Sequence, residues 1–155
     1  GICNGCQLMV ELGLVYPDHP EQPTMKHNKS EKFESAFLNV NIQENDSVML
    51  KSLSGLRMGI WVAHGEGRFC FPYYRDNYQI PVKYTYEGYP GNPNGSDFSA
   101  AALCSNDGRH LAMMPHLERA IFPWQWAYYP EDRPEDEVSP WIEAFVNARK
   151  WIQEK

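Results

Sequence analysis

Apolar residues recur along the chain at two periods, and these periods predict which segments form helices and which form strands. Residues 4–13 carry apolar side chains that favour a helix, and Gly13 is suited to end it. A second helix is predicted to begin at Ser139-Pro140, because serine can cap a helix and proline suits its first turn. Its apolar residues line one helical face: Trp141, Phe145, Ala148 and Ile152.

The middle of the chain carries strand signals. Apolar and β-rich runs predict strands at 33–42, 59–63, 82–86, 100–104 and 110–114. The last two flank Asn106-Asp107-Gly108, and Asp-Gly is a strong signal for a hairpin turn. Residues 17–32 are polar and contain prolines, so we expect a surface loop there. Strands mixed with two or three helices predict an α/β fold with an open sheet, whose sites lie beyond the carboxyl ends of the strands.

Composition and charge exclude several classes of protein. The chain has 155 residues, of which 43% are hydrophobic, and this suits one domain with a single core. Fourteen basic against twenty acidic residues give a net charge of −6, which disfavours binding to nucleic acid. No apolar run approaches the ~20 residues that span a membrane, and no signal peptide is recognisable. The four cysteines lack the pattern of a disulfide-rich scaffold, so we expect reduced thiols and a cytoplasmic location.

The first seven residues, Gly1-Ile2-Cys3-Asn4-Gly5-Cys6-Gln7, have the pattern of a nucleophile elbow, a sharp strand-to-helix turn that presents a reactive side chain. The positive end of the following helix favours the thiolate form of Cys3. A thiolate nucleophile needs a base, and the base needs a group that orients it. His116 and Glu118 offer both, two residues apart. We therefore predict that Cys3 is the nucleophile, His116 the base and Glu118 the carboxylate that holds the imidazole.

Simpler interpretations stand beside this one. Cys3 alone could be an ordinary buried thiol, and its spacing from Cys6 is also that of a redox dithiol or half a zinc site. Cys70 and Cys104 stand alone, so no second ligand pair completes a zinc site and we predict no metal. We expect Cys6 to pack beneath the elbow helix. His64, in the glycine-rich turn that follows the predicted strand at 59–63, is a rival base.

Four segments in the same order resemble the class I, triad-type glutamine amidotransferases. GICNGCQ at 1–7 is similar to their nucleophile motif G-x-C-x-G-x-Q, and MMPHLER at 113–119 is similar to their closing motif P-H-P-E-R. AHGEGR at 63–68 and YPGNPNGS at 89–96 are narrower, and resemble the glutaminase domains of large-form phosphoribosylformylglycinamidine synthases. One residue departs from the pattern: Leu117 stands where the family usually has proline, which would stiffen the backbone.

The resemblance implies an open, mostly parallel sheet flanked by helices, a flavodoxin-like fold, of which residues 1–155 would form the C-terminal portion of a single amidotransferase domain. The preceding strands would lie outside this chain, together with a glycine loop that supplies one oxyanion donor; the N–H of Asn4 would be the other. The resemblance also implies a set of groups that bind the substrate glutamine: the side chain of Gln7 and backbone groups around Ala63, His64 and Gly65. With the site incomplete, we expect little or no glutaminase activity from the 155-residue chain alone.

The activity implied by the resemblance is hydrolysis of L-glutamine through a γ-glutamyl thioester on Cys3. The ammonia would pass to a synthetase domain of the same parent chain, which converts formylglycinamide ribonucleotide to the amidine in purine biosynthesis with ATP and Mg²⁺. The sequence lacks a Walker-type glycine loop, so we expect no cofactor here. Two alternatives stay open: an inert α/β domain that serves as an interdomain or partner interface, or another cysteine hydrolase on a related scaffold. The second would not need Gln7 or the turn at 63–68.

Overall fold

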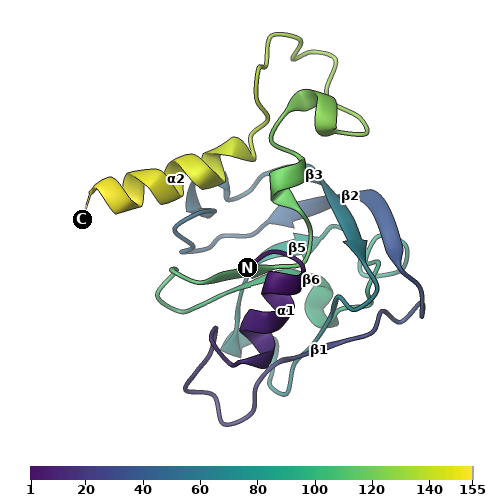
Figure 1. Cartoon of the computed structure of the whole chain (residues 1–155), viewed down its shortest axis with the longest axis vertical. Helices are drawn as coiled ribbons and strands as arrows, with labels where there is room; N and C mark the ends of the chain where they lie inside the picture. The colour runs from purple at the N-terminus through teal and green to yellow at the C-terminus, as the bar shows by residue number, and fades with distance from the viewer. Residues whose placement is uncertain (155) are drawn as a thin grey trace.

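Five strands form the main sheet of the computed structural model, which describes residues 1–154 (Figure 1). Their spatial order is β3 (Arg57–His64), β2 (Glu34–Ile42), β5 (Gln79–Tyr84), β6 (Ala100–Cys104) and β7 (Leu111–Met113). Each coincides with or overlaps one of the five predicted strands. A second sheet pairs two short strands that were not predicted, β1 (Thr24–Lys26) and β4 (Arg68–Cys70). Short 3₁₀ helices lie between these elements, at Lys51–Leu53, Arg75–Asn77, Asp97–Ser99, Leu117–Arg119 and Pro123–Gln125.

The main sheet is antiparallel, so the expectation of a mostly parallel, flavodoxin-like sheet is wrong for this chain. Each pair of neighbouring strands runs antiparallel. Parallel neighbours need a crossover of a dozen or more residues, usually a helix. In the described part of the chain no α-helix lies between α1 (Asn4–Glu11) and α2 (Ile142–Gln153), so the strands are joined by turns and irregular segments. Within residues 1–154, parallel pairing is confined to one bridge, between Ile2 and Met113.

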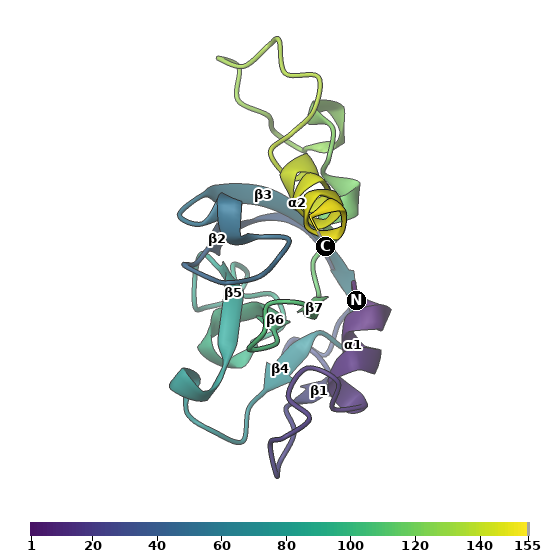
Figure 2. The same ribbon diagram turned by 90° about the vertical axis from the view of Figure 1, so that its left-hand side faces the viewer.

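Buried side chains form two clusters, and each cluster includes residues of β5, β6 and β7. The neighbouring residues Ala112 and Met113 of β7 belong to different clusters, as expected for side chains that alternate across a strand. One cluster includes Trp141 of α2, and the other includes Cys6 and Val10 of α1. In Figure 2, α1 accordingly lies beside β1 and β4, well apart from α2. The two helices therefore pack into different clusters.

Helix α1 follows Cys3 directly and ends at the predicted glycine. Gly13 has a φ of 66°, in the left-handed region that glycine adopts without strain. Its N–H donates to the carbonyl of Val10 at 3.0 Å, and the N–H of Leu14 donates to the carbonyl of Met9 at 2.9 Å. This pair of hydrogen bonds is a Schellman motif, which satisfies carbonyls left free at a helix end. The helix predicted over 4–13 is thus confirmed, with its last two residues in the cap.

Helix α2 begins at Ile142, slightly later than predicted. The hydroxyl of Ser139 accepts the N–H of Trp141 at 3.2 Å, so serine caps the turn that leads into the helix. Trp141 is buried, but Phe145 and Ile152 of the same apolar face are 41% and 69% exposed, so the sheet covers this face only in part. The reason is visible in Figure 1, where the C-terminal part of α2 extends past the sheet. Neither helix described in residues 1–154 is long and apolar enough to cross a bilayer.

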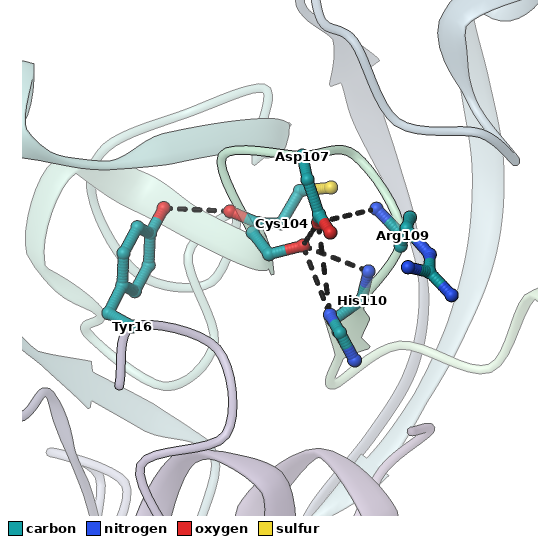
Figure 3. A network of polar contacts seen from close by, with 6 residues as sticks. Tyr16, Cys104, Asp107, Arg109 and His110 are labelled. Carbon is teal, nitrogen blue, oxygen red and sulfur yellow. Dashed lines mark hydrogen bonds and ion pairs between the residues drawn. The ribbon is translucent and has the colours of Figure 1, made fainter. Parts of the chain in front are cut away.

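A polar network closes the hairpin between β6 and β7 at the predicted Asp-Gly turn (Figure 3). The carboxylate of Asp107 accepts the hydroxyl of Ser105 at 2.6 Å, and that hydroxyl accepts the N–H of His110 at 3.0 Å. The hydroxyl of Tyr16 donates to the carbonyl of Cys104 at 2.8 Å, which ties the segment after α1 to the same hairpin. These contacts fix the position of β7, the strand against which the N-terminal residues pack.

Candidate active site

Cys3 occupies the sharp turn at the head of α1. Its backbone has φ 51° and ψ −108°, and a positive φ is strained for a residue that carries a side chain. Two hydrogen bonds of 2.9 Å hold the turn against β7, from the N–H of Cys3 to the carbonyl of Met113 and from the N–H of Met113 to the carbonyl of Gly1. The N–H of Asn4 is the first in α1 and so has no partner within the helix. It stands next to Cys3 in the chain, where an oxyanion donor would be needed.

His116 and Glu118 form a close pair in the segment after β7. The Nδ1 atom of His116 lies 2.6 Å from Oε1 of Glu118. Because an ionised carboxylate only accepts hydrogen bonds, Nδ1 carries a proton, and in the neutral ring the lone pair is on Nε2. Nε2 of His116 is buried and has no hydrogen-bond partner among residues 1–154. His116 therefore presents a free basic nitrogen.

Strand β3 brings Cys3 and His116 into one site. The Sγ atom of Cys3 faces the carbonyl oxygen of Ala63 at 3.9 Å. The N–H of His116 donates to the carbonyl of Trp61 at 2.8 Å, two residues earlier on the same strand. Across the described residues, the Sγ of Cys3 and the imidazole of His116 share no hydrogen bond. Such contacts are often long in a free enzyme and tighten when the substrate binds.

His64 lies in the same site but lacks the features of a base. Its side chain is buried, and burial, followed by the charge of His116, lowers the pKa of His64 to about 4. In residues 1–154 its ring contacts no carboxylate, whereas His116 is paired with Glu118. At neutral pH His64 is therefore uncharged and a poor acceptor of the Cys3 proton. Of the two histidines, His116 is better suited to the role of base.

The glycine-rich turn after β3 is held from two sides. The side-chain amide of Asn28 donates to the carbonyl of His64 at 2.8 Å and accepts the N–H of Gly67 at 3.1 Å. From the other side, the Nε2 of Gln7 donates to the carbonyl of Glu66. Helix α1 is thus joined to the turn through Gln7. The residues predicted to bind glutamine lie around one site: Gln7, Ala63, His64 and Gly65.

Cys6 has an environment opposite to that of a nucleophile. It is fully buried in the cluster beneath α1, as expected, and burial raises the pKa of its thiol far above the ordinary value. Burial also raises the pKa of Cys104 to about 11. All four cysteines are free thiols. In the part of the chain that the structure describes, His, Cys, Asp and Glu side chains form no group of three that could hold a metal ion.

Leu117, the residue that departs from the resembled motif, is part of the main core. Its side chain is buried in the cluster that also contains Trp141 and Ala120. It lies between His116 and Glu118 in the chain, so its burial fixes the backbone that carries both. Packing therefore supplies the rigidity that a proline ring would give by restricting φ.

Sequence reasoning misses two residues that support the turn. Asn28 falls in the predicted surface loop and Asn94 in the segment at 89–96, yet both are buried. The amide of Asn94 donates to the carbonyl of Gly67 and lies 3.4 Å from Nδ1 of His64. Asparagine beside proline and glycine is typical of exposed turns, so residue type alone does not indicate burial. The one available signal is that Asn94 lies within a segment that carries the family resemblance.

Comparisons with known proteins cover nearly the whole chain. A family model described as a CobB/CobQ-like glutamine amidotransferase domain matches residues 1–152. The phosphoribosylformylglycinamidine synthase of Drosophila melanogaster is 43% identical over 97% of this chain and 13% of its own length. The human protein of that name is 39% identical over 99% of this chain and 14% of its own length. The chain thus spans about an eighth of the length of these curated relatives.

A solved structure also resembles this chain. The structure of PurLQS from Thermotoga maritima superposes on this chain with a TM-score of 0.72, and the two are 25% identical in sequence. The likeness covers 98% of this chain and 60% of that chain. The arrangement of the antiparallel sheet and its helices is therefore shared with that structure over almost all of the present chain.

Proposed function

The chain belongs to the family of CobB/CobQ-like glutamine amidotransferase domains, and on this premise we propose that, in the complete protein, the side-chain amide of L-glutamine is hydrolysed at its Cys3. The observation that carries the proposal is the arrangement along β3. Ala63 faces the Cys3 sulfur at 3.9 Å, and Trp61 holds the backbone of His116 at 2.8 Å. Glu118, at 2.6 Å from Nδ1 of His116, orients the ring. This arrangement supports a nucleophile, a base and an orienting carboxylate acting together.

In the first half of the proposed reaction, the thiol of Cys3 gives its proton to Nε2 of His116 while the sulfur bonds to the amide carbon of glutamine. The oxygen of that amide becomes an oxyanion, and the N–H of Asn4 donates to it. The carbon–nitrogen bond then breaks as His116 returns the proton to the leaving nitrogen. Ammonia departs and a γ-glutamyl thioester remains on Cys3.

Water completes the cycle in the second half. Nε2 of His116 takes a proton from a water molecule, and the water oxygen attacks the thioester carbon. The carbon–sulfur bond breaks, glutamate leaves, and Cys3 regains its proton from His116. In both halves the carboxylate of Glu118 favours the charged imidazolium that forms transiently. One glutamine and one water therefore give one glutamate and one ammonia.

The α-amino-acid end of glutamine is proposed to bind between α1 and the glycine-rich turn. The contact of Gln7 with the carbonyl of Glu66 supports this, because it holds the helix and the turn together at the edge of the site. Backbone groups around Ala63 and Gly65, with His64 between them, would then bind the charged end of the substrate. Another cysteine hydrolase on a related scaffold would have no need for this contact.

We further propose that the complete protein is a phosphoribosylformylglycinamidine synthase. Support comes from the names of the curated relatives, of which this chain would be the glutaminase part. In this proposal a synthetase domain of the same chain receives the ammonia and converts formylglycinamide ribonucleotide to its amidine in purine biosynthesis. ATP and Mg²⁺ would act there, and this chain would need no cofactor.

A cytoplasmic location is proposed with the same function. The four free thiols suit a reducing compartment. A relative from Arabidopsis thaliana, 43% identical over 99% of this chain and 12% of its own length, is named "Probable phosphoribosylformylglycinamidine synthase, chloroplastic/mitochondrial". Localising a fluorescent fusion of the complete protein would decide between the cytoplasm and an organelle.

The strained backbone of Cys3 favours an enzyme over an inert interface domain. A positive φ at a residue with a side chain costs on the order of 1–3 kcal/mol and tends to persist where function requires it. An inert domain would gain stability by losing this strain. We therefore favour a catalytic domain over an inert one. The exposed aromatic residues Trp124 and Tyr128 are available for contact with a neighbouring domain.

Replacement of the base tests the proposed function. In the complete protein, His116→Ala should abolish glutamine-dependent synthesis and leave ammonia-dependent synthesis unchanged, because His116 would serve only ammonia release. His110→Ala is a matched control, since His110 belongs to the hairpin between β6 and β7. Equal loss with glutamine and with ammonia in the His116→Ala variant would contradict the proposed division between the two reactions.

A further inference from the structure

We propose that Asn94 is a positioning residue for the glutamine-binding turn, acting through the carbonyl of Gly67 and the ring of His64. The inference rests on the proposed function, because it concerns how this site holds its substrate. Asn94 belongs to a proline- and glycine-rich segment, yet its side chain is 0% exposed. A buried amide needs partners for its polar atoms, and the partners of Asn94 are what point to its role.

The amide of Asn94 has one stable orientation. Its Nδ2 donates to the carbonyl of Gly67, and its Oδ1 accepts the hydroxyl of Tyr84 at 3.3 Å. A flipped amide would set Oδ1 against the carbonyl of Gly67, where two acceptors repel each other. The Gly67 carbonyl therefore fixes which end of the amide faces the turn.

This orientation also determines where the proton of His64 resides. Nδ2 of Asn94 lies 3.4 Å from Nδ1 of His64, and an amide nitrogen can only donate. Nδ1 of His64 must then accept, so the proton of the neutral ring is on Nε2. Nε2 is buried with no partner in residues 1–154, and an unpaired buried donor is costly. An acceptor brought by a ligand, such as a carboxylate oxygen of the amino acid, would satisfy this N–H.

Gly67 permits this close approach. A Cβ built on Gly67 would overlap Nδ2 of Asn94 and crowd Nδ1 of His64, so any larger residue would displace the amide or the ring. On the far side of the loop, the carbonyl of Asn94 accepts the N–H of Lys29 at 3.0 Å. Asn94 is therefore held by its backbone as well as by its side chain, and can act as a fixed support for the turn.

A neighbouring asparagine provides the matched control. Asn92 is buried in the same segment, but its amide contacts only Ser96 among the described residues, donating to its carbonyl at 2.9 Å and accepting its N–H at 3.1 Å. Asn94→Asp keeps the shape and the acceptor of Asn94 and removes both N–H donors. Asn92→Asp makes the same chemical change one residue removed from the turn, because its partner Ser96 donates its hydroxyl to the carbonyl of Gly67 at 3.3 Å. Asn94→Leu, of similar volume, serves where a buried carboxylate prevents folding.

The experiment measures KM and kcat for glutamine in the complete protein, with limited proteolysis of the glutaminase part as a check on its folding. We expect Asn94→Asp or Asn94→Leu to raise KM for glutamine about ten-fold, the effect of losing one or two hydrogen bonds. The rate at which iodoacetamide alkylates Cys3 should stay within about two-fold, because this small reagent does not use the turn. We expect Asn92→Asp to have little effect on KM for glutamine.

Two results would overturn the inference. One is an unchanged KM with a kcat that falls in proportion to the folded fraction, as a merely structural residue would give. The other is an equal rise in KM for Asn92→Asp, which would assign the effect to the loop as a whole. Failure of the proposed function looks different: Cys3→Ala in the otherwise unaltered protein would then retain glutamine-dependent synthesis.

Discussion

Nδ1 of His116 and Oε1 of Glu118 lie 2.6 Å apart, within the range of a strong charge-assisted hydrogen bond. The two residues differ in exposure: the side chain of His116 is 8% exposed and that of Glu118 is 42% exposed. The imidazole is therefore fixed inside the site, while its carboxylate partner still reaches solvent. Glu118 thus orients the ring from the solvent side, which His116 needs if its Nε2 is to accept a proton.

Replacing Glu118 by glutamine should lower kcat for glutamine about a hundred-fold or more, because a neutral amide no longer stabilises the imidazolium. KM should change little. Arg119→Gln is the control, since Arg119 lies 3.7 Å from Glu118 at the surface and such pairs contribute little. Steady-state kinetics of glutamate release measures both variants. If kcat fell by a comparable factor in both variants, the loss would reflect the charge around the site and not the orientation of His116 by Glu118.

A glutamine analogue that carries a diazoketone should label Cys3 and spare Cys6. Cys3 is partly exposed at the elbow, whereas Cys6 is fully buried with a raised thiol pKa. Cys3 and Cys6 share one tryptic peptide, which ends at Lys26, so fragmentation of that peptide in the mass spectrometer identifies the labelled residue. Cys6→Ser should be labelled as fast as the unaltered protein. Preferential labelling of Cys6 would overturn the assignment of the nucleophile.

Acid should weaken this chain partly through His64. Its pKa in the folded state is about 4, below the ordinary value of 6.5, so the unfolded state binds the extra proton first as the pH falls. The free energy of unfolding should then drop by about 2 kcal/mol between pH 7 and pH 5 on account of this group. Urea unfolding, followed by tryptophan fluorescence, should show a smaller drop for His64→Gln. An identical pH dependence in the variant would argue against a buried neutral His64.

Gly67→Ala should impair glutamine binding, because its methyl group would overlap the amide of Asn94. A displacement of the turn by a fraction of an ångström should raise KM for glutamine about ten-fold or more. Gly88→Ala provides the comparison, since no atom lies within 4 Å of a Cβ added there. An equal KM for glutamine in Gly67→Ala and Gly88→Ala would mean that the turn accommodates the added methyl group without losing substrate binding.

Local signals in the sequence predict most of the elements. Gly13 marks the end of α1 because its left-handed backbone is a local requirement, and Asp107 marks the hairpin because its carboxylate bonds within the turn. Both features involve residues close together in the chain. They can therefore be read without knowledge of the rest of the fold.

Features that depend on contacts between separate segments of the chain could not be predicted from the sequence. Strand direction depends on which strands become neighbours, and the parallel sheet that the family resemblance implied is antiparallel in this chain. Burial of Asn94 depends on contacts with Gly67 and Tyr84, which are distant in sequence. Exposure of Ile152 likewise reflects where the sheet ends, not the helical period. The roles of Cys3 and the other site residues stay predictions.

The central claim is that glutamine becomes bound to Cys3 during the reaction. The most direct measurement is to mix the complete protein with isotope-labelled glutamine, quench in acid, and locate any γ-glutamyl adduct by peptide mass spectrometry. We expect a labelled thioester that fragmentation of the peptide locates on Cys3, and not on the nearby Cys6, and that is absent from Cys3→Ala. Continued glutamate production by Cys3→Ala, or an adduct on a different residue, would contradict it.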